Sequence, residues 1–111
     1  MAVAYVSYHQ VALTGAPYAS SVLGRSVYSA ELTIGGSEQE SAVLATTMGV
    51  AVVVARVTTD DTACYVATGT APDTTVTART AASSARFYLG AGATVEFELL
   101  YGERVAVKAV S

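Results

Sequence analysis

The chain has 111 residues, enough for a single domain with a modest core. Hydrophobic residues make up 52% of it and charged residues only 14%, against about 25% charged in an ordinary soluble domain. Small apolar and hydroxyl side chains must therefore cover much of the surface, which favours burial against a partner. The net charge is −3 and the six Lys and Arg residues are scattered singly, so the sequence excludes nucleic acid as the main ligand.

No membrane or disulfide signal is found along the chain. The longest apolar run, residues 50–55, is far shorter than the roughly 20 residues that span a bilayer. The first residues carry no basic region, so we expect neither a signal peptide nor a membrane partner. Cys64 is the only cysteine, which excludes an intrachain disulfide. These features predict synthesis in the cytoplasm.

Period-two alternation with β-branched and aromatic residues predicts a series of strands. Residues 2–13 are predicted to be extended, and residues 27–34 follow with Tyr28, Ala30, Leu32 and Ile34 on one face before Gly35-Gly36. Residues 50–57 are apolar on both faces, as in a central strand. The remaining expected segments are a turn at 58–62, a strand at 64–68, a Thr- and Ser-rich loop at 74–84 and a short strand at 86–89.

Residues 95–109 are predicted to form a hairpin around Tyr101-Gly102-Glu103. The alternation predicts Leu99 opposite Val105, Phe97 opposite Val107 and Val95 opposite Ala109, all on one face. Glu96 would then lie opposite Lys108 on the other face. Gly102 in the centre of the loop fits this turn poorly, because a three-residue hairpin loop usually has its glycine last.

Residues 37–48 are ambiguous. Ser37 with Glu40 matches a capping box, which favours a short helix near residues 38–48, whereas Val43, Thr46 and Thr47 favour a strand. Short strands separated by Gly and Pro turns predict an all-β fold, an antiparallel, jelly-roll-like β-sandwich formed by residues 1–111 as one domain.

Residues 1–24 contain no Asp, Glu, Lys or Arg. They are interpreted either as an N-terminal core strand or as an uncharged binding arm, because tyrosine is enriched at interfaces. Under the second interpretation the partner-binding residues are Tyr5, Tyr8, His9 and Tyr18.

No candidate catalytic, metal or cofactor residue emerges from the motifs. His9 is the only histidine and stands in no local motif, and Cys64 precedes an apolar strand without a basic neighbour to lower its pKa. Asp60-Asp61 lacks the ligand spacing of a calcium loop, and Glu96 and Glu98 alternate with apolar residues as a solvated strand face does. We therefore expect a protein that is not an enzyme and has no cofactor.

Two stretches resemble a known family. One is residues 57–72, in which Cys64-Tyr65-Val66-Ala67-Thr68-Gly69-Thr70-Ala71-Pro72 carries a strand–Gly–x–x–Pro pattern. The other runs from Arg86 through Leu89, Ala91-Gly92 and Glu96 to Gly102-Glu103-Arg104-Val105-Ala106-Val107. Together they resemble the capsid decoration, cement or staple proteins of tailed bacteriophages, of the epsilon15-like podovirus type. The resemblance covers about half of the chain and involves framework positions, so it assigns no ligand residues.

This resemblance implies a structural protein on the outer surface of an icosahedral capsid. It would bind the major capsid protein, associate with itself as a dimer or trimer at a symmetry axis, and bridge neighbouring capsomers. Three alternatives remain open: a phage fibre or lectin-like receptor-binding module, a head–tail or tail component, and a small enzyme. The absence of Trp, on which sugar rings often stack, counts weakly against the lectin-like module.

Overall fold

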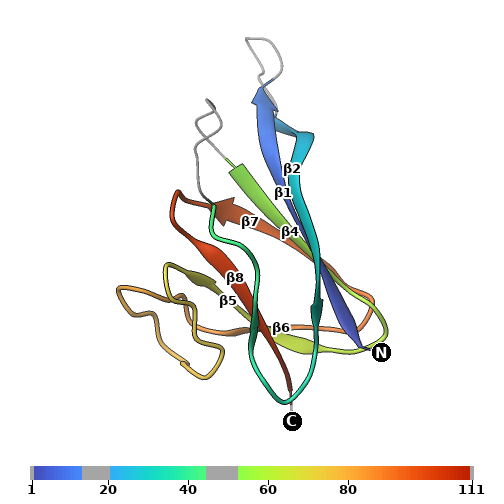
Figure 1. Ribbon diagram of the computed structural model, residues 1–111, viewed down its shortest axis with the longest axis vertical. Coiled ribbons are helices and arrows are strands. Elements are labelled where there is room, and N and C mark those ends of the chain that lie inside the picture. Colours follow the sequence, from blue (N-terminus) through green and yellow to red (C-terminus); the bar gives the residue numbers. More distant parts are fainter. Residues whose placement is uncertain (1, 14–20, 45–52, 111) are drawn as a thin grey trace.

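The protein consists of two four-stranded antiparallel sheets that pack face to face (Figure 1). The computed structural model describes residues 2–13, 21–44 and 53–110, in which all regular structure is β-strand. Sheet A has the order β2-β1-β4-β7, and sheet B has the order β3-β8-β5-β6. The strands are β1 (Val3–Leu13), β2 (Ser21–Thr33), β3 (Gln39–Glu40), β4 (Val53–Thr59), β5 (Cys64–Gly69), β6 (Phe87–Leu89), β7 (Thr94–Leu99) and β8 (Arg104–Ala109). The predicted all-β sandwich is confirmed, and a jelly-roll topology stays a prediction.

The core lies between the sheets and follows the alternation of each strand. In β4 the burial alternates along the strand, with Ala55 and Val57 fully buried and Arg56 exposed between them. From the other sheet, Val66 of β5 and Val107 of β8 are also fully buried. At about 25 cal/mol per Å² of apolar surface removed from water, these contacts supply the main favourable term of folding.

Residues 3–13 form an interior strand of sheet A. Strand β1 pairs with β2 along one side and with β4 along the other, so that Val6 lies between Ala30 and Val57. This part of the chain is therefore fixed on both sides by backbone hydrogen bonds and is not a detachable arm. Beyond Gln10 its only partner among the described strands is β2, and β1 and β2 extend together past the other described strands (Figure 1).

The predicted hairpin of residues 95–109 is wrong, because its two strands lie in different sheets. Phe97 of β7 pairs with Ala55 of β4, whereas Val107 of β8 pairs with Val66 of β5. Alternation decides which side chains face the core, and it does not decide which strand lies alongside. The prediction that Leu99 and Val105 face the core is correct, because both are buried, but they reach the core from different sheets.

The chain changes sheets at the turn after Leu99, where Gly102 has a φ of 87°. This left-handed conformation suits glycine, which has no Cβ to clash with the backbone. The predicted pairing of Glu96 with Lys108 is wrong for the same reason. Glu96 instead lies 3.4 Å from Arg56 on β4, and Lys108 lies opposite Tyr65 on β5.

No helix forms within the described part of residues 38–48, which ends at Leu44. Gln39 and Glu40 pair with Val107 and Ala106 as strand β3, and residues 41–44 continue without regular structure. Of the two alternatives left open for this segment, the helix does not form over the described part, and Glu40, the acid of the possible capping box, forms an ion pair with Arg104 at 3.1 Å. Tertiary pairing has overridden a local helix signal.

A chain of hydrogen bonds joins the sheets through this segment. The Val105 amide of β8 donates to Ser41 Oγ at 2.8 Å, and Ser41 Oγ lies 2.5 Å from the Tyr8 hydroxyl. Tyr8 donates to the Ala42 carbonyl at 2.5 Å, so Ser41 must be the donor to Tyr8. The ring of Tyr8 also packs against that of Tyr28, whose hydroxyl accepts a bond from the Ala42 amide. We call Tyr8, Tyr28 and Ser41 the tyrosine latch.

Replacing Tyr8 by Phe is expected to lower the free energy of unfolding by about 1–3 kcal/mol, because the buried Ser41 hydroxyl loses its acceptor and the Ala42 carbonyl loses a donor. The matched control is Tyr5→Phe on the outer face of β1, where 47% of the side chain is exposed and we expect a change within about 0.5 kcal/mol. Urea denaturation measures both values. Equal effects of the two variants would show that the latch adds nothing to stability.

Stability is expected to fall between about pH 9 and 12. Burial raises the pKa of Cys64 from 9.0 to about 11 and that of Tyr8 from 10.0 to about 12. The unfolded chain loses these protons first, so the stability that the neutral groups provide is complete below pH 9 and is lost as pH rises through the folded pKa values. Urea denaturation across this range checks the decline, which should be shallower in Cys64→Ala at its lower end and in Tyr8→Phe at its upper end. A stability independent of pH over the whole range would contradict it.

Candidate functional site

Hydroxyl side chains stabilise the turns of the long connection between β5 and β6. Thr80 Oγ1 accepts hydrogen bonds from the amides of Ala82 and Ser83, at 3.3 and 3.0 Å. Ser83 Oγ accepts from the Asp73 amide and Ser84 Oγ accepts from the Thr68 amide, both at 2.9 Å. Short hydroxyl side chains stabilise turns in this way, which explains why a Thr- and Ser-rich stretch forms an ordered loop. The predicted loop at residues 74–84 is thereby confirmed.

Gly69 lets this loop lie directly against the end of β5. Its φ is 148°, and a Cβ built on it would lie 2.1 Å from the carbonyl oxygen of Ala82. No side chain fits in that space, so the glycine sets how closely the loop approaches the sheet.

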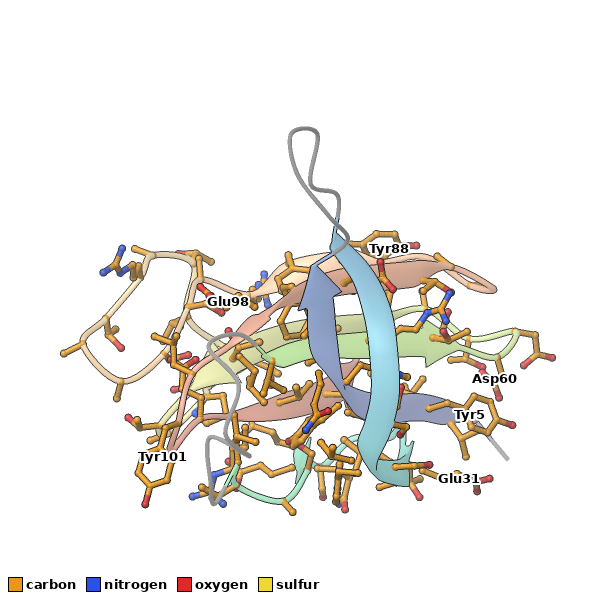
Figure 2. The ribbon with its side chains drawn as sticks, turned by 90° about the horizontal axis from the view of Figure 1, so that it is seen from above. Tyr5, Glu31, Asp60, Tyr88, Glu98 and Tyr101 are labelled. Carbon is orange, nitrogen blue, oxygen red and sulfur yellow. The ribbon has the colours of Figure 1, made fainter. Side chains whose placement is uncertain are left out.

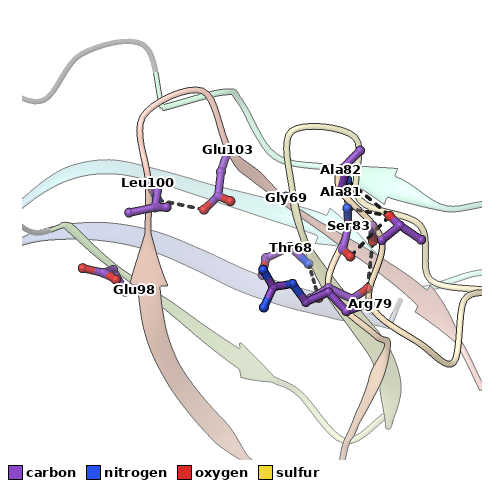
Figure 3. Close-up of a pocket in the computed structure, with 11 residues that line it drawn as sticks. Thr68, Gly69, Arg79, Ala81, Ala82, Ser83, Glu98, Leu100 and Glu103 are labelled. Carbon is purple, nitrogen blue, oxygen red and sulfur yellow. Dashed lines mark hydrogen bonds between the residues drawn. The ribbon is translucent and has the colours of Figure 1, made fainter.

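A cavity of about 320 Å³ opens beside this contact, at the end of the sandwich where β5 and β7 end (Figure 3). Its charged side chains are Arg79 from the loop, Glu98 from β7 and Glu103 from the turn before β8. Glu103 accepts a hydrogen bond from the Leu100 amide at 2.8 Å, and neither Arg79 nor Glu98 forms an ion pair within the described part of the chain. The remaining lining residues are Thr68, Gly69, Thr80, Ala81, Ala82, Ser83, Ser84 and Leu100.

Exposed apolar side chains lie next to the cavity. Leu100 is 55% exposed and Tyr101 is 65% exposed, although both are large apolar residues. The segment ending at Leu44 runs beside this turn, because the Gly102 amide donates to the Leu44 carbonyl and the Leu44 amide donates to Glu103, each at 2.9 Å. It carries Val43, which is 41% exposed. We call Val43, Leu100 and Tyr101 the apolar tip.

The apolar tip and the cavity share Leu100 and form one candidate binding surface. Clustered exposed apolar side chains rimmed by polar groups are typical of protein interaction sites. Sequence reasoning missed this surface, because Val43 and Leu100 come from segments separated by more than fifty positions in the chain. The available signal was the pair Leu100-Tyr101, two large apolar residues immediately before a turn glycine.

The residues predicted to bind a partner do not share one surface. Tyr8 faces the core and is 1% exposed, so its side chain is not available to a partner. Tyr5 and His9 lie on the opposite, outer face of β1, where His9 Nε2 lies 2.8 Å from Ser7 Oγ. Tyr18 lies outside the described residues. Figure 2 shows Tyr5 and Tyr101 on opposite sides of the molecule.

The acidic and sulfur side chains considered in the sequence have structural surroundings. Asp60 accepts hydrogen bonds from the amides of Val3 and Thr62, each at 3.0 Å, and so holds its turn against β1. Cys64 is fully buried, and burial raises the pKa of its thiol to about 11, which keeps it protonated. Among the residues that the structure describes, no cluster of three His, Cys, Asp or Glu side chains could hold a metal ion.

Comparison with known proteins finds no matching family model, curated protein or solved structure. Within the described ranges, the structure contains no helix of the length and hydrophobicity needed to cross a membrane.

Replacing Gly69 by Ala is expected to lower the free energy of unfolding by about 2 kcal/mol or more, because the new Cβ would collide with the Ala82 carbonyl. Gly36→Ala is the matched control, since nothing lies within 4 Å of a Cβ at that position. Thermal unfolding of both variants tests this. If Gly69→Ala proved as stable as the control, the close approach of the loop to β5 would be wrong.

Proposed function

We propose that the chain is a structural virion protein that decorates an icosahedral bacteriophage capsid. In this role it binds the outer surface of the major capsid protein and bridges neighbouring capsomers, which stabilises the shell. Two lines of reasoning support the proposal: the sequence resemblance of residues 57–107 to decoration proteins and the apolar tip on the folded molecule.

The apolar tip is the observation that carries the proposal. Leu100 and Tyr101 are each more than half exposed, and their turn is bonded to Leu44, the residue after the exposed Val43. Full burial of one such side chain against a partner contributes about 1.5–3 kcal/mol. Glu98 and Glu103 border the patch and would form the polar rim that specific interfaces have around an apolar centre.

Self-association would provide the second contact that bridging requires. Strand β2 is an edge of sheet A and pairs only with β1 among the described strands. Its segment from Tyr28 to Leu32 keeps a regular register, with Glu31 as its only charged residue. An edge that has no second strand partner among the described residues can pair with the edge of another chain, so a second copy is a suitable occupant. Linking two capsid-binding sites in one dimer raises the effective concentration for the second contact.

Capsid binding is expected to weaken in Leu100→Ser and Tyr101→Ser, by about ten-fold or more for each, because each removes an apolar anchor from the proposed interface. The measurement is co-sedimentation of the purified chain with shells of the phage that encodes it, together with the copy ratio to the major capsid protein. Tyr5→Ser is the comparison variant, because Tyr5 is exposed on a different side of the molecule.

Three results would contradict the proposal. Failure of the unaltered chain to sediment with shells would reject the decoration role. Loss of binding in Tyr5→Ser with full binding in both tip variants would place the contact on the outer face of β1 instead. Turnover of a substrate by the isolated chain without any shell would replace the structural role with an enzymatic one.

A further inference from the structure

A row of three side chains crosses the outer face of sheet B. Tyr88 of β6 lies opposite Tyr65 of β5, and Tyr65 lies opposite Lys108 of β8. Directly opposed residues on neighbouring strands point to the same side of a sheet. Cys64 and Val66 face the core, so the row points away from it. Tyr88 is 62% exposed, and Figure 2 shows it on a different side of the molecule from Tyr101.

The loop between β5 and β6 leaves this part of the sheet open. Farther along the strands, Ala67 and Ala106 also point away from the core, yet both are fully buried. The loop covers these two alanines. It is held over them by the bonds between Ser84 and Thr68 and by the contact of Ala82 with Gly69. The loop ends at Arg86, just before β6, and leaves the row of Tyr88, Tyr65 and Lys108 uncovered.

Arg86 contacts Tyr65, the central residue of this row. Its guanidinium carbon lies 4.0 Å from the centroid of the Tyr65 ring, and the rings of Tyr65 and Tyr88 meet edge to face with centroids 6.4 Å apart. The N–H donors of a guanidinium can bind two oxygens of a carboxylate or phosphate. Contact with the Tyr65 ring restricts the position of the Arg86 guanidinium before any ligand arrives.

The positive charge beside the tyrosines is not neutralised within the described residues. Neither Arg86 nor Lys108 has a carboxylate oxygen within 4.0 Å. Asp73 is close enough to Lys108 for the charge to contribute to the lowered pKa of Asp73, but that pKa is lowered mainly by hydrogen bonds from Thr75. Two tyrosine rings therefore lie beside two cations, Arg86 and Lys108, that can still bind an oxyanion.

The size of the row favours a small ligand over a protein surface. Strands lie about 4.8 Å apart, so Tyr88, Tyr65 and Lys108 span about 10 Å, the length of one or two sugar rings. A stable protein interface covers about 800 Å² on each partner, and the covering loop limits the open face on one side. A sugar ring offers an apolar C–H face to tyrosine, and an acidic sugar adds the oxyanion.

We infer that Tyr65, Tyr88, Arg86 and Lys108 form a binding site for an anionic saccharide, a sugar ring that carries a carboxylate or phosphate group. The sugar stacks on Tyr88, and its oxyanion binds between Arg86 and Lys108. This site is independent of the apolar tip, so the decoration function and saccharide binding can fail separately.

The test uses the full chain labelled with ¹⁵N and monitors amide shifts during titration. The probes are trigalacturonic acid for a carboxylate, glucose 6-phosphate for a phosphate, and galactotriose as the neutral sugar. We expect the acidic probes to shift amides of β5, β6 and β8 around the row, and galactotriose to bind about ten-fold more weakly or worse. Binding should also weaken as salt is raised.

Variants connect the binding to the proposed side chains. Tyr88→Ala and Arg86→Gln are each expected to weaken acidic-sugar binding by about ten-fold, and the control Tyr101→Ala should leave it unchanged. Tyr88 is largely exposed, so its replacement should not alter the melting temperature, which is measured in parallel.

Four outcomes would overturn the inference: no binding of either acidic probe, equal binding of galactotriose, shifts confined to other parts of the molecule, and unchanged binding in both variants. A poly-glutamate peptide that shifts the same amides more strongly than the sugars would assign the site to an acidic protein segment instead.

Discussion

The hydrogen bonds between Tyr8, Ser41 and Val105 are the constraint on which the rest of the molecule depends. The donor directions are fixed, because Val105 donates to Ser41, Ser41 to Tyr8, and Tyr8 to the Ala42 carbonyl. Each hydroxyl both donates and accepts, and such chains strengthen one another in a poorly solvated interior. The same burial raises the pKa of Tyr8, so the latch stays neutral and intact over the physiological pH range. Two sheets that otherwise contact through apolar side chains are thereby held in one relative position.

The tyrosine latch also positions the apolar tip. It fixes Ser41 and Ala42, and the next residues then bond to the turn between β7 and β8 through Leu44. Val43 is exposed next to Leu100 and Tyr101 because its neighbours on both sides are held by these bonds. The cavity on the other side of Leu100 depends on a second backbone contact, that of Gly69 with Ala82. The backbone beside the apolar tip is thus held by main-chain bonds at Leu44, which leaves the side chains of the tip available to a partner.

The sequence predicts which residues face the core better than it predicts which strands pair with each other. Alternation correctly identified Leu99 and Val105 as core residues, but placing them side by side required knowledge of β4 and β5, which pair with their strands. The ambiguity after Ser37 has a similar origin, because the local capping signal does not show that Glu40 pairs with Ala106 and forms an ion pair with Arg104 of a distant strand. Both candidate sites combine residues far apart in the sequence, such as Val43 with Tyr101 and Tyr65 with Tyr88. No motif marks such combinations, since the strand order alone brings them together. The tyrosines that did attract notice, Tyr5 and Tyr8, lie on opposite faces of one strand.

The size of the apolar tip determines how a decoration protein of this kind must bind. Three side chains at about 1.5–3 kcal/mol each give a gross gain that is largely offset by the roughly 4–15 kcal/mol of translational and rotational freedom lost on association. One tip on one free capsid subunit would therefore bind weakly. On an assembled shell the subunits repeat at fixed spacing, so a dimer joined through β2 would form its second contact at high effective concentration. Binding would then favour the lattice over the free subunit, and this difference in affinity is what would stabilise the shell. Weak single contacts also fit the low charge of the chain, because few charged groups must be desolvated when its surface is covered.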